Sequence, residues 1–576
     1  MKEYLQLTDR KQARQFLPSD FSITTWEALE PYLKKLEEAE LDSADKLMAF
    51  LQDRSELDAV VSEDFAWRYI GMTCDTANEE KQQAYQTFLN DIFPHLSTYE
   101  DKLNRKMAAS PFFGQLPQEP YLTYVRSVKR NIELFREENV ALSMEAQNTS
   151  RQFGALNGAM TIEHDGQTLT LQQASKYLES GDRSLRELIW EKVNKRRAED
   201  ADKLEEVFDK LVELRHSMAK NAGYSSYTQY KFESMGRFDY TPADTKAFHE
   251  AVETVVKPVM QEFAKERKER LGLDELRPWD GGVDIYGQEP LSPFHGGEEL
   301  RKGTVTALKD LRPELGEMIE IMHDKGFLDL DSRVGKAPGG YNYPLMESGI
   351  PFIFMNASGT QADVVTMFHE SGHAVHTFLT RDLPIGAVKS TPAEVAELAS
   401  HSMELLCLEG YKVFYDDEHA MKRAQKRQLR RCISLFPWIA TVDAFQQWVY
   451  DHPDHSREER YMKWKEFYAR FHGEEVSWEG LDYYLERMWL KQIHIFEYPF
   501  YYIEYAIAQL GAFGVWKNYR ENPEQGLTNY LEALKLGYTR PIPEIYERAG
   551  IAFDFGADYM KECVEFCMQA YRAIDV

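Results

Sequence analysis

Two histidines and one glutamate lie at a spacing that lets a single helix offer all three side chains to one metal ion. The segment from Thr366 to His376 reads T-M-F-H-E-S-G-H-A-V-H and contains the H-E-x-x-H pattern. Because residues four apart share a helical face, His369 and His373 can point their imidazoles at the same zinc ion. Glu370 lies one position further round the helix, where its carboxylate can reach a water molecule on that ion. The pattern therefore predicts two metal ligands and a general base.

The residues around the motif predict where its helix begins and what lies beside it. Thr360 and Asp363 have the spacing of a capping box, in which each side chain accepts a hydrogen bond from the other residue's backbone amide. Val364 and Phe368 then contribute to an apolar face. Gly372 costs about 1 kcal/mol relative to alanine inside a helix. We therefore expect another segment to pass close to the backbone at this glycine.

A zinc site that catalyses hydrolysis needs a third protein ligand, with the fourth position left for water or substrate. His376 lies one turn beyond His373. The chain lacks the glycine and the last histidine of H-E-x-x-H-x-x-G-x-x-H, which excludes the metzincin arrangement. We therefore expect His376 to pack beside the site, and the third ligand to come from further along the chain.

A second helix is predicted downstream, from Pro392 to Leu406. Proline suits the first turn of a helix, and good helix formers follow it. Candidate ligands recur along this segment at Glu394, Glu397, His401 and Glu404. The last three lie at i, i+4 and i+7 and so share one face. Spacing alone leaves the ligand open, because a glutamate near a helix start is often only a partner of the helix dipole.

Several segments, in a fixed order along most of the chain, resemble one known family. They are the glycine pair and its neighbours at 339–342, the apolar run at 351–356, the two helices above, and the aromatic segment at 494–505. The chain resembles the oligoendopeptidase F branch of the thimet-oligopeptidase-like zinc metallopeptidases. The resemblance implies a mainly α, multi-lobed zincin metallopeptidase fold, with a small β-sheet beside the active site and a substrate channel between helical lobes.

The same resemblance implies roles for residues of the two helices. The third zinc ligand is then Glu397, five residues after the proline, rather than Glu394. Glu404 fits a residue that orients a ligand imidazole through a hydrogen bond, and we expect Asp363 and His401 close around the ligands as well. At His401 the chain departs from the family, where we expect a smaller or apolar residue, so its role stays open.

Members of this family use a histidine and tyrosines from the aromatic segment to bind substrate and stabilise the transition state. Matching the spacing selects four residues for these roles: His494, Tyr498, Tyr502 and Tyr505. One continuous helix would place the three hydroxyls on one face, although Pro499 starts or interrupts that helix. An aromatic stripe is equally expected in a core, and we assign Tyr501 to that role.

The apolar run at 351–356 ends in turn residues and predicts a strand that is either buried or at the edge of a sheet. An edge strand beside the metal helix can hold an extended peptide through main-chain hydrogen bonds. The resemblance also places the glycine loop near substrate. The residues predicted to contact substrate are therefore Gly339, Gly340, Tyr341, Phe352 and Phe354.

These predictions converge on a zinc-dependent oligoendopeptidase that hydrolyses internal bonds of short, unstructured peptides. One Zn2+ per chain would lower the pKa of a water molecule to about 7, and Glu370 would accept its proton before passing it to the leaving amine. Two alternatives stay open. A zinc metallocarboxypeptidase of the carboxypeptidase Taq type shares H-E-x-x-H but needs a cation to bind a C-terminal carboxylate. A noncatalytic peptide-binding protein on a peptidase fold would have no use for the base.

The length of 576 residues suggests two or more lobes. An N-terminal helical region is predicted over 1–185. Leu29, Leu33 and Leu36 have helical spacing near its start, and Asp165 and Gly166 predict a β-hairpin near its end. The zinc metallopeptidase catalytic region is predicted over 186–576.

Charge and composition exclude several classes of partner. A net charge of -27 opposes nonspecific binding to nucleic acid. The first ten residues lack the apolar stretch of a secretory signal, and the span 498–516 carries Glu504 and several tyrosines, which argues against a membrane helix. Five cysteines, a small and odd number, suit a reducing compartment. We expect a cytoplasmic protein whose partners are short peptides, with no membrane and no nucleic acid.

Overall fold

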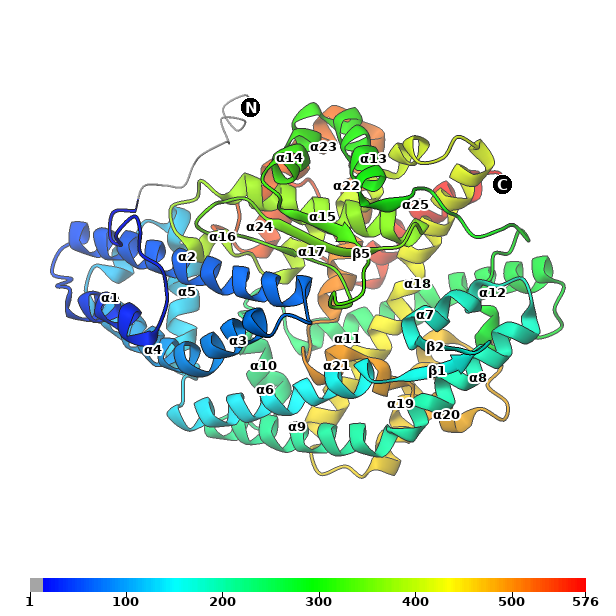
Figure 1. Ribbon diagram of the computed structural model, residues 1–576, viewed down its shortest axis with the longest axis horizontal. Helices are drawn as coiled ribbons and strands as arrows, with labels where there is room; N and C mark the ends of the chain where they lie inside the picture. Colours follow the sequence, from blue (N-terminus) through cyan, green and yellow to red (C-terminus); the bar gives the residue numbers. More distant parts are fainter. Residues whose placement is uncertain (1–13) are drawn as a thin grey trace.

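The computed structural model describes residues 14–576 as a mostly helical molecule with two small β-sheets (Figure 1). The mainly α fold class is thereby confirmed. The start of the chain, where no secretory signal is predicted, lies outside the described residues. Within residues 14–576, no helix combines the length and the apolarity that crossing a membrane requires.

Five helices form the N-terminal end of the molecule, drawn in shades of blue at one side of Figure 1. They are α1 (Trp26–Glu38), α2 (Ala44–Cys74), α3 (Glu79–Thr87), α4 (Phe93–Ala109) and α5 (Gln118–Leu134). Their apolar side chains form a core that includes Leu29, Leu33 and Leu36, so the predicted helix is confirmed. Ile385 and Val388, from much later in the chain, complete this core and tie the N-terminal helices to the rest of the molecule.

The middle of the chain supplies seven helices: α6 (Glu137–Gly158), α7 (Leu171–Ser175), α8 (Arg183–Glu199), α9 (Ala201–Asn221), α10 (Tyr227–Ser234), α11 (Pro242–Ala251) and α12 (Lys257–Leu271). The long helices α6 and α9 pack along each other at the lower edge of Figure 1. The predicted hairpin is confirmed as the antiparallel strands β1 (Thr161–His164) and β2 (Gln167–Thr170). Its turn has positive φ at both Asp165 and Gly166. The domain boundary near residue 185 stays a prediction.

The remaining α-helices follow in the second half of the chain, and most of them share one large core with the middle helices. They are α13 (Gly296–Leu311), α14 (Pro313–Asp324), α15 (Gln361–Thr380), α16 (Gly386–Lys389), α17 (Ala393–Leu406), α18 (Glu418–Asp451), α19 (Arg457–His472), α20 (Asp482–Glu486), α21 (Ile493–Phe496), α22 (Ile503–Glu521), α23 (Pro523–Leu534), α24 (Ile542–Arg548) and α25 (Ala557–Ala573).

A three-stranded sheet lies beside the helix that carries the H-E-x-x-H motif. Its strands are β3 (Leu328–Asp331), β4 (Tyr341–Tyr343) and β5 (Phe352–Ala357). They run in the order β3-β5-β4, so the strand predicted at 351–356 is the central one and β4 is at an edge. Phe352 and Phe354 are buried against Ala66 and Ile70 of α2. We therefore correct the prediction that these two rings contact substrate, because they form part of a core.

The helices α15 and α17 hold the motif residues and cross closely. α15 begins as predicted, because Thr360 Oγ1 accepts the Asp363 amide at 3.3 Å and Asp363 Oδ2 accepts the Thr360 amide at 2.8 Å. A Cβ atom added to Gly372 would lie 2.4 Å from the carbonyl oxygen of Ala399 in α17. The close approach expected at this glycine is confirmed, and it brings the polar faces of the two helices together.

Candidate metal centre and active site

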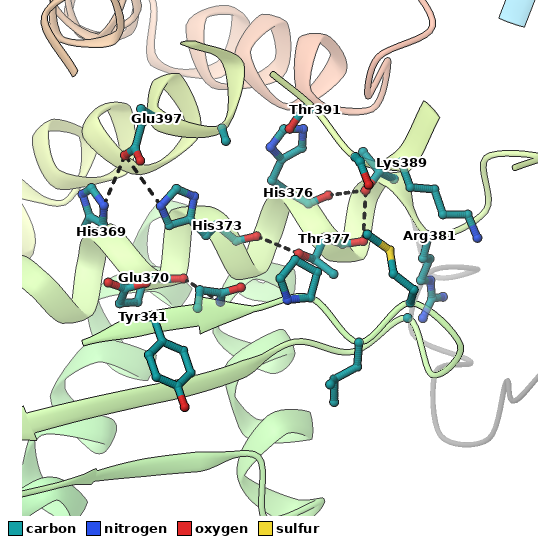
Figure 2. A pocket seen from close by; sticks show the side chains of 18 of the residues that line it. Tyr341, His369, Glu370, His373, His376, Thr377, Arg381, Lys389, Thr391 and Glu397 are labelled. Atoms are coloured by element: carbon teal, nitrogen blue, oxygen red, sulfur yellow. Dashed lines mark hydrogen bonds and ion pairs between the residues drawn. The ribbon is translucent and has the colours of Figure 1, made fainter. Parts of the chain in front are cut away.

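The structure brings the three predicted metal ligands together between α15 and α17 (Figure 2). Oε2 of Glu397 lies 3.4 Å from Nε2 of His369 and 3.7 Å from Nε2 of His373. The three ligand atoms all lie within 4.8 Å of one another. Atoms about 2.0–2.2 Å from a tetrahedral zinc ion stand about 3.3–3.6 Å apart. The side chains therefore fit a zinc ion after small adjustments.

Glu394, the alternative ligand on the first turn of α17, takes part in a different cluster. Its Oε1 accepts a hydrogen bond from the Tyr240 hydroxyl at 2.5 Å and lies 3.9 Å from Nε of Arg237. Both partners are buried. Of the two glutamates, Glu397 is the one that lies beside both imidazoles of the motif.

Glu404 contacts His369 on the nitrogen that does not face Glu397. Its Oε1 lies 2.8 Å from Nδ1 of His369, and its Oε2 accepts hydrogen bonds from Gln428 at 2.7 Å and from Arg431 at 3.1 Å. A carboxylate at Nδ1 holds the proton there and leaves the Nε2 lone pair for a metal. Burial alone would lower the pKa of His369, but the Glu404 hydrogen bond and the nearby carboxylates raise it to about 9, so a metal ion that binds Nε2 must displace a proton from it.

Replacing Glu404 with alanine should weaken zinc binding by about 10–100-fold. The His369 imidazole would lose the hydrogen bond that fixes its tautomer and its orientation. Competition with a chelator measures the zinc affinity. Glu409, which is exposed just beyond α17, gives a matched control variant, Glu409→Ala. Equal zinc affinities in the two variants would contradict the role assigned to Glu404.

Glu370 follows the first ligand and faces the same pocket. Its side chain is buried, and its Oε2 atom accepts no hydrogen bond from residues 14–576. Burial raises the pKa of Glu370 to about 7, because it disfavours the charged carboxylate. Asn342 of β4 donates a hydrogen bond to the Glu370 carbonyl oxygen at 3.2 Å and ties the edge strand to this turn of α15. A carboxylate with this pKa can accept a proton near neutral pH.

The aromatic segment is not one helix: the interruption predicted at Pro499 is present, so Tyr498 does not share a helical face with the later tyrosines. α21 ends at Phe496 and α22 begins at Ile503. Between them Pro499 breaks the helix, and Phe500 takes a φ of 67°, in the left-handed region that non-glycine residues rarely adopt. Tyr498 is 53% exposed as a result.

The loop between α21 and α22 aims Tyr501 at the metal centre, which corrects our assignment of this residue to the core. The Tyr501 hydroxyl donates a hydrogen bond to Oε1 of Glu397 at 3.0 Å, and the side chain lines the pocket. Phe500 holds the loop in place, because its amide donates to Gln446 at 3.0 Å and its carbonyl accepts from Arg237. Helical periodicity missed Tyr501; the proline of this segment was the signal that the period would break.

His494 lies at the centre of the tyrosines of this segment. Its ring centroid is 4.6 Å from that of Tyr502 and 5.8 Å from that of Tyr505. Tyr501 and Tyr498 lie slightly further away, at 6.1 and 6.2 Å. The structure therefore brings the predicted histidine and tyrosines together, and Tyr505 is the predicted tyrosine that lines the pocket.

Two residues expected around the ligands have different surroundings. Asp363 stays at the start of α15, where its carboxylate accepts hydrogen bonds from Ser358 and Thr360, so its predicted place beside the ligands is wrong. Six residues of helix, about 9 Å, separate it from His369. His401 does lie close, with its ring 5.4 Å from that of His369 and its Nδ1 2.8 Å from Oε1 of Gln509.

The metal ligands open into a pocket of about 510 Å³. Gly340 and Tyr341 line it from the sheet side, and buried His376 lines it from α15. Tyr341 is fixed by a 2.6 Å hydrogen bond between its hydroxyl and that of Thr73. Figure 2 shows His369, His373 and Glu397 at one end of this pocket, and Arg381, which follows α15, and Lys389 of α16 at the other.

Comparisons with known proteins agree with the fold. Residues 16–135 match the peptidase M3 N-terminal domain, and residues 176–565 match peptidase family M3. The chain is similar to PZ peptidase A, solved with inhibitor 2, at 25% identity and a TM-score of 0.90, over 97% of this chain and 99% of that chain.

Curated relatives include bacterial oligopeptidases. The chromosomal oligoendopeptidase F of Lactococcus lactis subsp. cremoris is 24% identical over 331 residues, 53% of this chain and 50% of the relative. Oligopeptidase PepF of Bacillus subtilis is 22% identical over 404 residues, 65% of this chain and 58% of the relative. The match thus spans about half the length of these relatives. Because the family model alone covers more than half of the chain, the resemblance seen in the sequence is confirmed, and the chain belongs to peptidase family M3.

Proposed function

We propose that this protein is a zinc-dependent oligoendopeptidase that hydrolyses internal bonds of short, unstructured peptides. The observation that carries the proposal is the convergence of His369, His373 and Glu397 within 4.8 Å, beside the buried carboxylate of Glu370. Two imidazoles and a carboxylate form a ligand set that suits zinc, although cobalt and manganese accept the same set. The names of the relatives, oligoendopeptidase F and oligopeptidase, support a peptide substrate.

The proposed reaction follows from the position of Glu370. When bound, zinc supplies Lewis acidity and lowers the pKa of a water molecule to about 7. Glu370 would accept a proton from the attacking water as the water oxygen bonds to the peptide carbonyl carbon. Glu370 then donates the proton to the leaving amine as the C–N bond breaks. The products are one new carboxyl group and one new amine, so Glu370 returns to its starting form.

Two tyrosines at the pocket have separate roles in this proposal. The Tyr501 hydroxyl donates a hydrogen bond to Glu397, and so it holds the ligand carboxylate in place. Tyr505 lines the pocket, and burial raises its pKa well above the usual value, which keeps the hydroxyl protonated. We assign to Tyr505 the donation of a hydrogen bond to the oxyanion that develops on the carbonyl oxygen.

The variants Tyr505→Phe and Tyr501→Phe should separate these roles. Tyr505→Phe should lower kcat by about 10²–10³-fold, because it removes one oxyanion donor, and should leave zinc affinity unchanged. Tyr501→Phe should weaken zinc affinity by about 10-fold or more, as expected when a ligand loses the hydrogen bond that orients it. Steady-state kinetics and chelator competition measure the two effects. An unchanged kcat in Tyr505→Phe would contradict its role as oxyanion donor. An equal fall in zinc affinity in both variants would contradict the assignment of ligand orientation to Tyr501 alone.

The edge strand β4 offers the proposed enzyme a way to hold peptides of many sequences. β4 pairs with β5 on one side and joins α15 through the Asn342 hydrogen bond. An extended peptide added to such an edge is held by its main chain, which is common to all sequences. The volume of this pocket, about 510 Å³, is in the range of sites that bury small ligands, as a short peptide segment requires.

Mass spectrometry of a peptide mixture tests the proposal against its alternatives. Short peptides, some blocked at both ends and some free, are incubated with the zinc-loaded protein with and without a chelator. Internal cuts in blocked peptides that stop with the chelator support the oligoendopeptidase. Stepwise trimming confined to free C-termini would replace it with a zinc metallocarboxypeptidase. Zinc binding with no cleavage would replace it with a noncatalytic peptide-binding protein.

A further inference from the structure

The pocket that starts at the metal ligands ends at two cationic side chains (Figure 2). Arg381 directly follows the last residue of α15, and Lys389 is the last residue of α16. Both line the same pocket as Glu370 and Glu397. A cationic end to this pocket is notable in a chain whose net charge is -27.

The backbone that carries Lys389 is fixed from both sides. At the start of α16, the Gly386 amide donates a hydrogen bond to Oγ of Ser55 in α2 at 2.8 Å. At its end, the Val388 carbonyl accepts a hydrogen bond from the Tyr538 amide at 2.8 Å. The Val388 side chain is fully buried in the N-terminal core. The packing of two parts of the molecule therefore fixes the backbone position of Lys389.

The ammonium group of Lys389 has no partner of its own in this arrangement. Across residues 14–576, no side chain or carbonyl forms a hydrogen bond or an ion pair with Lys389 Nζ. Asp382 acts on it only through its charge, and burial lowers the pKa of Lys389. A half-buried cation without a partner is held at a cost in free energy, and an anion that enters the pocket would offset that cost.

We propose that Lys389 binds a carboxylate of the peptide substrate at the end of the pocket away from the metal. The inference rests on the proposed function and adds a determinant of specificity to it. Carboxylates are the anionic groups that unmodified peptides carry, and a lysine ammonium forms strong charge-assisted hydrogen bonds with them. Arg381 lines the same end of the pocket, and Asp382, whose carboxylate lies 3.9 Å from Nε of Arg381, offsets part of its charge.

The distance along α15 sets where in the substrate this carboxylate lies. Arg381 is eight residues after His373, which is about 12 Å along the helix axis. An extended peptide advances about 3.3 Å per residue. A carboxylate held beside Arg381 at this end of the pocket would therefore lie about three or four extended residues from the scissile bond. Its source is either the C-terminus of a short peptide or an aspartate or glutamate side chain at that position.

Peptides that differ only in this carboxylate test the inference. One internal sequence that the wild-type protein cleaves is made as a free acid, as a C-terminal amide, and as an amide with glutamate at the third position after the cut. Each is tested with the wild-type protein, Lys389→Met and Lys389→Arg, all loaded with zinc. Lys246→Met, which removes an exposed lysine of α11, controls for the loss of a positive charge.

The wild-type protein should cleave the free acid with a kcat/KM about 10–100-fold above that of the amide, the size expected for a hydrogen bond to a charged group. Lys389→Met should lose this advantage while it cleaves the amide as the wild type does. Lys389→Arg should keep most of it, and Lys246→Met all of it. If the amide that carries glutamate is cleaved by the wild type with a kcat/KM close to that of the free acid, an acidic side chain is a second source of the carboxylate.

Two negative results have different meanings. If the wild type cleaves free acid and amides equally, or if Lys389→Met keeps the preference for a carboxylate, the inference about Lys389 is overturned and the peptidase proposal stands. If the zinc-loaded wild type cleaves none of the peptides in the initial mixture, the proposed function itself fails.

Discussion

The variant Glu370→Gln is expected to lose nearly all turnover while it keeps its zinc. An amide has almost the same size as the carboxylate but cannot accept a proton, so the water would keep its proton and the leaving amine would receive none. Loss of a general acid and base typically costs about 10²–10⁴-fold in rate. The measurement is kcat on an internally quenched peptide that is blocked at both ends, with zinc content determined on the same sample.

Glu409→Gln makes the same chemical change at an exposed position just beyond α17 and should leave kcat unchanged. Near-wild-type kcat in Glu370→Gln would show that another group accepts the proton. Loss of zinc together with activity would show that Glu370 acts on the metal site rather than on the water.

The variant Glu397→Ala is expected to lose zinc first and activity in consequence. Glu397 is the carboxylate that lies within 4 Å of both His369 and His373, and it accepts hydrogen bonds from Tyr501 and from Ser400. Its removal leaves two protein ligands. Zinc affinity should therefore fall by more than the about 100-fold expected for the loss of an outer hydrogen-bond partner.

Excess zinc distinguishes this variant from Glu370→Gln. Because Glu397→Ala keeps the general base, added zinc should restore part of its activity by mass action. No amount of zinc should restore Glu370→Gln. Zinc affinity in Glu397→Ala equal to that of the wild type would remove Glu397 from the ligand set, and Glu394→Ala would then be the next variant to measure.

Local patterns predicted the two helices of the metal centre well. The capping box at Thr360 and Asp363 depends on a spacing that one sequence shows directly, and both of its hydrogen bonds are present. Gly372 also carried information, because a glycine inside a helix is unfavourable unless another backbone needs the space. That backbone is α17, which bears Glu397.

The aromatic segment shows where periodicity fails. A face built on i, i+4 and i+7 requires one continuous helix, and Pro499 with the left-handed Phe500 interrupts it. The conformation of Phe500 is fixed by Gln446 and Arg237, which come from distant parts of the sequence. The position of Tyr501 therefore depends on tertiary contacts that no local pattern contains.

The strand order of the sheet and the far end of the pocket could not be predicted from the sequence, because both depend on tertiary contacts. The run that contains Phe352 and Phe354 predicts a strand, but only the order β3-β5-β4 shows that it is central. Asp363 caps the start of α15, and this local role accounts for the residue without a place beside the metal ligands. Lys389 gave no signal in the sequence, because its lack of a partner is a property of the folded pocket.

Titration of the metal-free protein with zinc tests the central claim most directly. A peptide blocked at both ends is present throughout, and its internal cleavage is followed as zinc is added. We expect no cleavage without metal, a linear rise, and a plateau at one zinc ion per chain. Cleavage by the metal-free protein, or a zinc-saturated protein that leaves the blocked peptide intact, would contradict the assignment of a zinc-dependent oligoendopeptidase.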